Sequence, residues 1–406
     1  MKSIRNKLSL ATCSLLTTGN ASAEAIENAW EVDSSYLYYS EVDRVTVNKF
    51  VGSAKGFVSA DDTAQIKVVF DAMSGATPSG AVKNTSLTFT GASGGSGITP
   101  VGNNAALADF NDARAAVAVN WQHEYTRTFN VGYIGAFSVE NDWRSFSLAA
   151  TANKDTSNRS TTWSLGISGT YDQIYRVNGH NTPEPITPVA DEDFLGTGER
   201  TTTDVIAGVT RVINRRTVAQ LNLAFGYSQG YMTDPYKIFS IVDANGIEWD
   251  QYFEGRPDSR FRWSITANLN HMTFPGNNGM HLSYRYYSDD WGVKSNTLDY
   301  SHRYIFENSD YLEPRIRLYK QSKADFYQNS FYSPNDGTTP ALPEYLSADY
   351  RLDDMSDITV GLAYGLRFGS DAELRTRLEY FYQTFENATF DTNKVIVFNI
   401  SYGKRF

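Results

Sequence analysis

The sequence predicts an all-β fold, a transmembrane antiparallel up-and-down β-barrel of about 16 strands. Three observations predict it: a secretion signal at the N-terminus, a hydrophobic pattern of period two, and a C-terminal strand that ends on an aromatic residue. The chain has 406 residues, 41% hydrophobic and 14% aromatic, which is too apolar for a disordered chain. Beyond the N-terminus no stretch approaches the roughly 18 consecutive apolar residues of a membrane-spanning helix, so a helical membrane protein is excluded.

The first 23 residues have the three parts of a signal peptide. Residues 2–7 carry three basic side chains, residues 8–16 form a short apolar run, and Ala21-Ser22-Ala23 offers the small residues that a signal peptidase accepts. We expect cleavage near Ala23, which leaves residues 24–406 as a single barrel domain. The signal peptide and the barrel together predict the outer membrane of a Gram-negative cell as the location.

The predicted cleavage also decides the cysteine content and the charge of the mature chain. Cys13 is the only cysteine, and it lies inside the signal, so the mature chain could form no disulfide. The alternative, a lipoprotein anchored through Cys13, would need an unusually short apolar region. Removing three basic and no acidic residues changes the net charge from −10 to −13. This balance argues against nucleic acid as a partner.

The C-terminus alternates apolar and polar residues and stops at Phe406. This pattern resembles the C-terminal β-signal of bacterial outer-membrane proteins, carried here by Phe398, Ile400, Tyr402 and Phe406. The resemblance implies two partners, the barrel-assembly machinery and outer-membrane lipid. Lys404 departs from the usual pattern, in which an apolar or aromatic residue stands two before the end. The alternative is a soluble edge strand that ends in phenylalanine.

The same period of two runs through the chain, clearest from Ile358 to Phe368 and again from Leu374 to Gln383. Such segments have the 9 to 11 residues that a tilted strand needs to cross the hydrocarbon. The template predicts sixteen strands, with starts near Trp30, Arg44, Ala64, Ala113, Val131, Trp143, Thr161, Thr202, Thr217, Ser259, Gly279, Thr297, Tyr311, Ser356, Glu373 and Lys394. A soluble propeller or sandwich is the alternative, but the chain lacks the internal repeats and regular short turns that it would need.

The lengths of the connections test this model, because short turns face the periplasm and long loops face outside. Counting back from a periplasmic C-terminus places all the long connections on the outer side. They are residues 74–112, 172–200, 230–258 and 327–354. The inner side receives only shorter links, such as 153–160 and 369–372. We expect the bulky outer loops, 327–354 above all, to narrow or close the passage if they fold inward.

Seven segments resemble the proteobacterial domain of unknown function 3570. They are Asp71–Gly80, Gly230–Lys237, Arg256–Arg260, Tyr284–Gly292, Tyr311–Arg315, Ala324–Tyr327 and Ser347–Arg351. The resemblance spans nearly all of the mature chain and implies an outer-membrane barrel while leaving the activity open. It also suggests an envelope partner, since such genes are often found near flavin-transferase and thioredoxin-like genes.

Charged residues at period two define the candidate site, the inward face of the second half of the barrel. Its lining candidates are Arg260, Arg262, Arg285, Asp299, Arg303, Glu313, Arg315, Arg317, Arg375, Arg377 and Glu379. One interpretation is a basic wall that favours anionic solutes, as charged rings do in pores. The other is a ladder of cross-strand salt bridges that fills and stiffens the lumen, because buried arginine must be paired or hydrated.

No motif indicates an enzyme, a metal site or a cofactor. The five histidines are His123, His180, His271, His281 and His302, and none belongs to a catalytic or metal-binding motif. His281 falls on the lumen face, where a satisfied histidine is the favoured interpretation over a base. The glycine-rich residues 91–97 indicate a loop. Asp243-Ala244-Asn245-Gly246 is interpreted as an ordinary turn and Asp289-Asp290 as a solvated hairpin tip, with calcium binding as the alternative for both.

The sequence leaves two leading functions. The first is a channel or porin-like passage for small solutes, anionic ones if the basic wall is the correct interpretation, through a 16-strand barrel. The second is a non-conducting barrel that anchors an envelope partner, such as a lipoprotein or a redox or flavin-related protein. An outer-membrane enzyme is the third and least favoured class.

Overall fold

The computed structural model describes residues 30–82, 98–101, 105–176, 181–190, 194–273 and 278–406. The predicted signal peptide with Cys13, the glycine-rich segment 91–97 and His180 therefore lie outside the described residues. Among the described residues, no helix has the length and apolar character needed to cross a membrane. One turn of 3-10 helix, η2 (Tyr350–Leu352), interrupts a fold made of strands.

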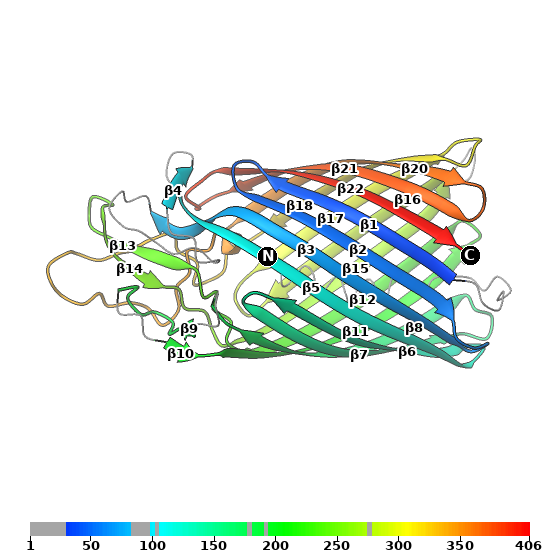
Figure 1. The fold of residues 1–406 in the computed structure, drawn as a ribbon, viewed down its shortest axis with the longest axis horizontal. Helices are drawn as coiled ribbons and strands as arrows, with labels where there is room; N and C mark the ends of the chain where they lie inside the picture. Colours follow the sequence, from blue (N-terminus) through cyan, green and yellow to red (C-terminus); the bar gives the residue numbers. More distant parts are fainter. Residues whose placement is uncertain (1–29, 83–97, 102–104, 177–180, 191–193, 274–277) are drawn as a thin grey trace.

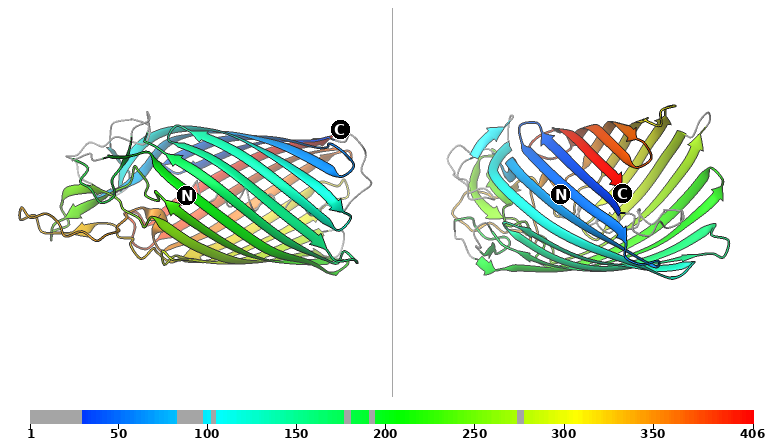
Figure 2. Two further views of the ribbon diagram at one scale, coloured as in Figure 1. Left: turned by 90° about the horizontal axis from the view of Figure 1, so that it is seen from below. Right: turned by 45° about the vertical axis from the view of Figure 1, so that its right-hand side comes forward.

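The described chain forms a closed antiparallel barrel of 16 strands, in agreement with the predicted number. Its wall strands, in order, are β1 (Trp30–Glu41), β2 (Val45–Phe57), β3 (Asp62–Val82), β5 (Ala105–Thr126), β6 (Phe129–Glu140), β7 (Trp143–Asp155), β8 (Thr161–Ile174), β11 (Gly198–Asn214), β12 (Thr217–Gly230), β15 (Ser259–Thr273), β16 (Asn278–Asp289), β17 (Lys294–Ile305), β18 (Tyr311–Gln321), β20 (Met355–Phe368), β21 (Ala372–Phe385) and β22 (Thr392–Arg405). Each strand pairs with its neighbour in the chain, and β22 returns to pair with β1, which closes the cylinder (Figures 1 and 2).

The wall is apolar outside and polar inside, the reverse of a soluble protein. On β20 the outward Ile358, Val360 and Leu362 are each about half exposed, at 49% to 51%, whereas the inward Asp357 and Thr359 are 3% and 0% exposed. A soluble sandwich or propeller would bury the first set and expose the second. An apolar outer face around a polar interior is the arrangement that a lipid-embedded barrel requires.

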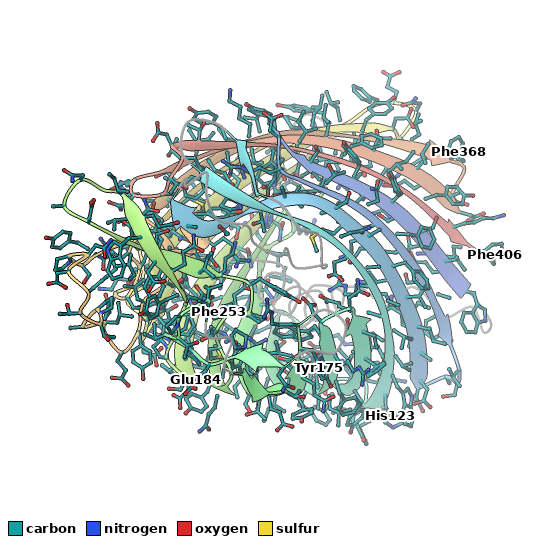
Figure 3. The ribbon with its side chains drawn as sticks, turned by 60° about the vertical axis from the view of Figure 1, so that its left-hand side comes forward. His123, Tyr175, Glu184, Phe253, Phe368 and Phe406 are labelled. Atoms are coloured by element: carbon teal, nitrogen blue, oxygen red, sulfur yellow. The ribbon has the colours of Figure 1, made fainter. Side chains whose placement is uncertain are left out.

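Aromatic side chains stand on the outside of this wall. Phe368 and Phe406 project outward at one rim, with 55% and 67% of their surface exposed (Figure 3). Phe398 and Tyr402 of the predicted β-signal also face outward, at 36% and 41% exposed, on the strand that closes the barrel. Aromatic rings at a rim are typical of membrane interfaces.

The two ends of the barrel differ. We call the end that holds Trp30 and Phe406 the terminal end, where the backbone N–H of Phe406 donates to the carbonyl of Trp30 at 2.8 Å. All connections at this end have two to five residues. All four long connections lie at the other end, the cap end, as their sorting in the sequence predicted.

The predicted loop 74–112 is wrong in its bounds. β3 continues to Val82 and β5 begins at Ala105, because the two strands stay paired beyond the rim, with Ser74 opposite Asn111 and Pro78 opposite Leu107. The short strand β4 (Ile98–Val101) adds to this extension. The period of two fades there because no membrane requires an apolar outer face.

Two long connections fold together into a compact unit that we call the cap, residues 231–258 and 322–354. It contains the hairpin β13 (Ile238–Val242) and β14 (Glu248–Phe253), and the short strand β19 (Phe331–Tyr332), which runs parallel to β13. A two-stranded ribbon, β9 (Thr182–Pro183) and β10 (Phe194–Gly196), lies at the same end of the barrel (Figure 1). Phe239, Ile241, Tyr252 and Leu346 form a buried apolar core within the cap.

The apolar outer face predicts that a charged substitution destabilises the barrel more at the middle of the membrane than near its surface. Leu378→Arg, at the middle of β21, is expected to lower the free energy of unfolding by about 2 to 4 kcal/mol in a bilayer, whereas Val32→Arg, next to the rim, should cost about 0 to 1 kcal/mol. Both wild-type side chains are exposed, at 55% and 42%. Urea unfolding in phospholipid vesicles measures the difference. Equal, small effects for both variants would mean that no lipid surrounds this wall.

Candidate functional site

The register of the strands puts all eleven predicted lining residues on the face opposite the exposed apolar ones. Seven of the eight arginines lie within 4.0 Å of a carboxylate oxygen. They are Arg260, Arg262, Arg303, Arg315, Arg317, Arg375 and Arg377. This pattern favours the salt-bridge ladder over a continuous basic wall.

Arg315 is the centre of the densest part of the ladder. Its Nη1 lies 2.6 Å from Glu379 Oε1, and its Nε donates to Asp299 at 3.0 Å. Glu313 accepts from Arg303 Nε at 2.7 Å and also lies 3.8 Å from Arg377. Three carboxylates and three guanidinium groups from β17, β18 and β21 therefore neutralise one another.

Several of the acidic partners were not predicted. Asp204 lies 2.6 Å from Arg262, and Asp357 lies 3.9 Å from Arg317. Arg375 lies 3.4 Å from Asp33 and 3.3 Å from Glu373. Buried Asp289 binds Arg260, which corrects the expectation that this aspartate stands on a solvated hairpin tip. The alternation of inward and outward residues within each strand could have placed these acids on the inner face. Only the register between strands shows which arginine each acid contacts.

Arg285 is the exception in the ladder. Among the described residues it has no carboxylate within 4.0 Å, and its guanidinium carbon lies 5.5 Å from the centre of the Tyr287 ring. Its register partners are Thr266 and Thr297, which carry no charge. On the same face of β16, His281 has its Nδ1 2.8 Å from Asn270 Oδ1, a satisfied histidine rather than a base aimed at a substrate. Arg285 is therefore the cation of the predicted set that is best placed to meet a passing anion.

A second group of charges, which sequence reasoning missed, lies in the cap. We call it the mouth cluster: Asp234, Lys237, Glu254, Arg256, Asp349 and Arg351. Arg256 Nη2 lies 2.6 Å from Glu254 and 2.9 Å from Asp349, and Arg351 Nη2 lies 2.9 Å from Asp234. Glu254, Asp349 and Lys237 are only 0%, 2% and 3% exposed. Three acids and three bases thus form a buried and electrically balanced network.

The mouth cluster reaches across the end of the barrel. Lys237 follows β12, yet its Nζ lies 3.4 Å from Thr77 Oγ1 and donates to the carbonyl of Pro78 on β3, six strands away along the wall. A Cβ on Gly80 would overlap the carbonyl of Ile238, and Gly80 has a φ of 101°. Only glycine permits this close approach. The cap is thus fastened to the far side of the rim.

Burial and charge act in opposite directions on the acids of the cluster. Burial alone would raise the pKa of Asp349, but Arg351, Lys237 and Arg256 hold it well below its usual range. The same three bases lower the pKa of Asp234 against its burial. Burial raises the pKa of Glu254 despite the nearby Arg256, and burial lowers the pKa of Lys237. Asp349 and Asp234 are therefore the acids whose ionised forms hold the cap together.

Six of the seven family-like segments meet at this end. Segments 71–80, 230–237, 256–260 and 347–351 supply five of the six residues of the mouth cluster, all but Glu254, and its contact with β3. Trp291 from 284–292 packs with Ala324 and Tyr327 from 324–327 in a second apolar core. The seventh segment, 311–315, supplies Glu313 and Arg315 of the ladder. The family-like segments therefore contribute side chains to both the cap and the ladder.

The candidate calcium ligands have other roles. Asp243 accepts backbone hydrogen bonds from Asn245 and Ile247 at 2.8 and 2.9 Å, which shapes the β13–β14 turn.

A further acidic group lies at the rim, where Asp112, Glu140 and Asp142 bring three carboxylate oxygens within 4.8 Å of one another. Burial raises the pKa of Asp142 to about 7, with the charge of Asp112 adding to the rise. Such acidic groups are common without a metal, and we assign no ion to this one.

Removing one charge from the mouth cluster should loosen the cap without unfolding the barrel. Arg256→Met removes the cation that bridges Glu254 and Asp349, so buried Glu254 loses its ion-pair partner while Asp349 keeps only Arg351. We expect a local loss of about 3 to 5 kcal/mol. Hydrogen exchange of residues 231–258 would measure it as faster exchange, with the wall strands unchanged. Lys323→Met, which removes an exposed cation from the same cap, is the matched control and should leave exchange as in the wild type.

Acid should loosen the cap in the same way. Asp349 and Asp234 have folded-state pKa values below the usual 3.8, so their stabilisation is present above pH 3.8 and is lost as the pH falls below it. Protonation of Glu254 has the opposite effect on stability, because its raised pKa in the folded state favours the protonated form. The protection of the cap amides against hydrogen exchange, relative to the intrinsic rate at each pH, should therefore fall below pH 3.8 in both the wild type and Glu254→Gln. An acid response that survives in Asp349→Asn plus Asp234→Asn would contradict this assignment.

Comparisons with known proteins identify the family and leave the activity open. Three solved structures resemble the fold: a bacterial polysaccharide outer membrane secretin (TM-score 0.45, 8% identity, 94% of this chain and 98% of that chain), OccD3 (OpdP) of Pseudomonas aeruginosa (0.45, 10%, 95% and 93%) and OpdK of P. aeruginosa (0.43, 9%, 94% and 100%). At this similarity none of their activities is transferred. No curated protein matches the chain. A family model described as protein of unknown function (DUF3570) matches residues 5–396, and the chain belongs to this family.

Proposed function

We propose that this protein is a porin-like channel for small solutes in the outer membrane of a Gram-negative cell. One observation carries the proposal: a closed 16-strand wall with an apolar outer face and a charged inner face. Barrels of this size usually enclose a water-filled passage. The secretion signal predicted at residues 1–23 and the short turns of the terminal end support the orientation, with that end in the periplasm.

The charge pattern supports a channel with a modest preference for small anions. Most of the arginines are neutralised by the ladder, so a strong basic field is not expected. Arg285 is the one predicted lining arginine that has no carboxylate within 4.0 Å among the described residues. A single such group gives a local anion-binding position rather than a charged ring.

The alternative is a non-conducting barrel that anchors an envelope partner. The mouth cluster favours it, because the cap is fastened across the mouth by Lys237 and Pro78. A permanently closed mouth would leave the outer loops or the terminal end as the surface for a lipoprotein or a redox or flavin-related protein. We propose neither a catalytic role nor a cofactor, because the inward His281 is committed to Asn270.

Conductance in a planar bilayer separates the two functions. The channel proposal expects stable openings of the refolded protein, with larger conductance in Arg256→Met, whose cap is loosened. A heat-modifiable barrel that never conducts, even with this variant, would support the anchor.

Ion selectivity then tests the role of Arg285. Arg285→Ala should lower the preference for anions by removing a cation that has no carboxylate partner. Arg375→Ala plus Arg377→Ala should shift selectivity further toward cations, because it removes two inward cations and takes one ion-pair partner each from Glu373 and Glu313. Selectivity that is unchanged in all variants would mean that ions do not pass these side chains.

A further inference from the structure

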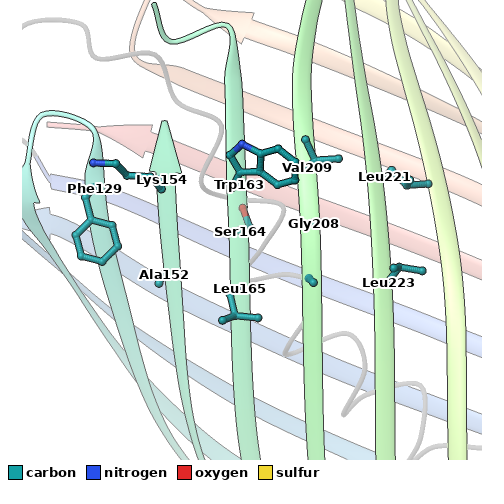
Figure 4. Close-up of a pocket in the computed structure, with 11 residues that line it drawn as sticks. Phe129, Ala152, Lys154, Trp163, Ser164, Leu165, Gly208, Val209, Leu221 and Leu223 are labelled. Carbon is teal, nitrogen blue, oxygen red and sulfur yellow. The ribbon is translucent and has the colours of Figure 1, made fainter. Parts of the chain in front are cut away.

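An apolar groove lies on the outside of the wall, near the terminal end and remote from the mouth (Figure 4). Trp163, Leu165 and Ile167 on β8 form a ridge, and each is 56% to 59% exposed. Small residues flank this ridge in register: Ala152 lies opposite Leu165 on β7, and Ala207 lies opposite it on β11. Both flanks of the ridge are therefore shallow, and we call these two sides of the one groove its channels.

A cation stands at the terminal end of each channel. Lys154 follows Ala152 on β7, and Arg211 follows Ala207 and Val209 on β11, all with side chains on the outer face. The two cations flank β8, so about two strand spacings, or roughly 10 Å, separate their strands. Within the described residues, neither has a carboxylate within 4.0 Å. Lys154 Nζ donates to Thr128 at 3.1 Å and lies 5.8 Å from the Phe129 ring centre.

The turns beside the groove extend this positive rim. Arg127, Arg159 and Arg215 are exposed on three adjacent turns at the terminal end, and Arg159 Nη2 donates to the carbonyl of Arg127 at 2.9 Å. No carboxylate of the described chain lies within 4.0 Å of these three side chains either. The rim beside the groove thus carries an arc of positive charge, although the whole chain is acidic.

We propose that this face binds one anionic phospholipid, with its two acyl chains in the channels beside the β8 ridge and its phosphate between Lys154 and Arg211. The inference rests on the membrane location in the proposed function but not on conduction. Two apolar channels that each end at a cation match a diacyl lipid with one negative headgroup. Trp163, at the same level as Lys154, suits the interface between headgroup and hydrocarbon. A second copy of the chain fits less well, since its positive rim would face another positive rim.

Native mass spectrometry of the refolded protein in detergent tests the proposal, with phosphatidylglycerol, phosphatidylcholine and lipid A as probes. The wild type should bind phosphatidylglycerol in preference to the other two. Lys154→Gln plus Arg211→Gln should weaken phosphatidylglycerol binding roughly 30-fold, from about 1 kcal/mol for each cation. Phosphatidylcholine binding should change little.

Two further variants separate the groove from a general charge effect. Lys404→Gln plus Arg405→Gln removes two cations from the opposite arc of the same rim and should leave lipid binding unchanged. Ala207→Leu fills one channel without changing the charge and should weaken the binding of phosphatidylglycerol. Heat-dependent gel mobility shows that each variant is folded. Equal binding of phosphatidylglycerol and phosphatidylcholine by the wild type, a preference for lipid A, or an equal loss in the control would overturn the proposal, whether or not the barrel conducts.

Discussion

The pairing of β1 with β22 is the constraint on which the rest of the structure depends. In hydrocarbon no water is available to backbone N–H and carbonyl groups, so a spanning sheet must have no free edge. The register from Glu31 opposite Arg405 to Glu41 opposite Val395 removes that edge. Once the sheet is closed, successive side chains of a strand face lipid and lumen in turn. The polar side chains of the wall must then face the lumen.

The inward charges follow from this closure, because a guanidinium group enclosed by a wall needs a partner. Arg315 meets Asp299 on β17 and Glu379 on β21, and Arg262 meets Asp204 on β11. The bridge to Asp299 joins the neighbouring strands β18 and β17, whereas the bridges to Glu379 and Asp204 each reach over one intervening strand, β20 or β12. The interior therefore gains rigidity from charge pairs, while the hydrophobic effect holds the outer face in lipid.

The wall could be predicted from the sequence, but the cap could not. Ile358, Val360 and Leu362 alternate with small or polar residues because lipid acts on one face alone, so local pattern suffices to find a strand. Asp234, Arg256 and Asp349 obey no period, and their contacts join segments about 90 to 120 residues apart. The partner of each inward arginine was hidden for a related reason: Asp204 and Arg262 are 58 residues apart and meet only through the register of β11, β12 and β15.

The cap and the wall are held by different physical forces, which allows one to move while the other stays fixed. The wall is held by continuous backbone pairing between strands, so the loss of one side chain changes it little. The cap depends on a buried network in which Asp349 alone contacts both Arg256 and Arg351. A permanent lid would be more stable with apolar residues at these positions, since buried ion pairs seldom repay their desolvation. A charged network can instead be opened by the loss of one partner, and its position across the mouth connects that opening to the passage that we propose through the barrel.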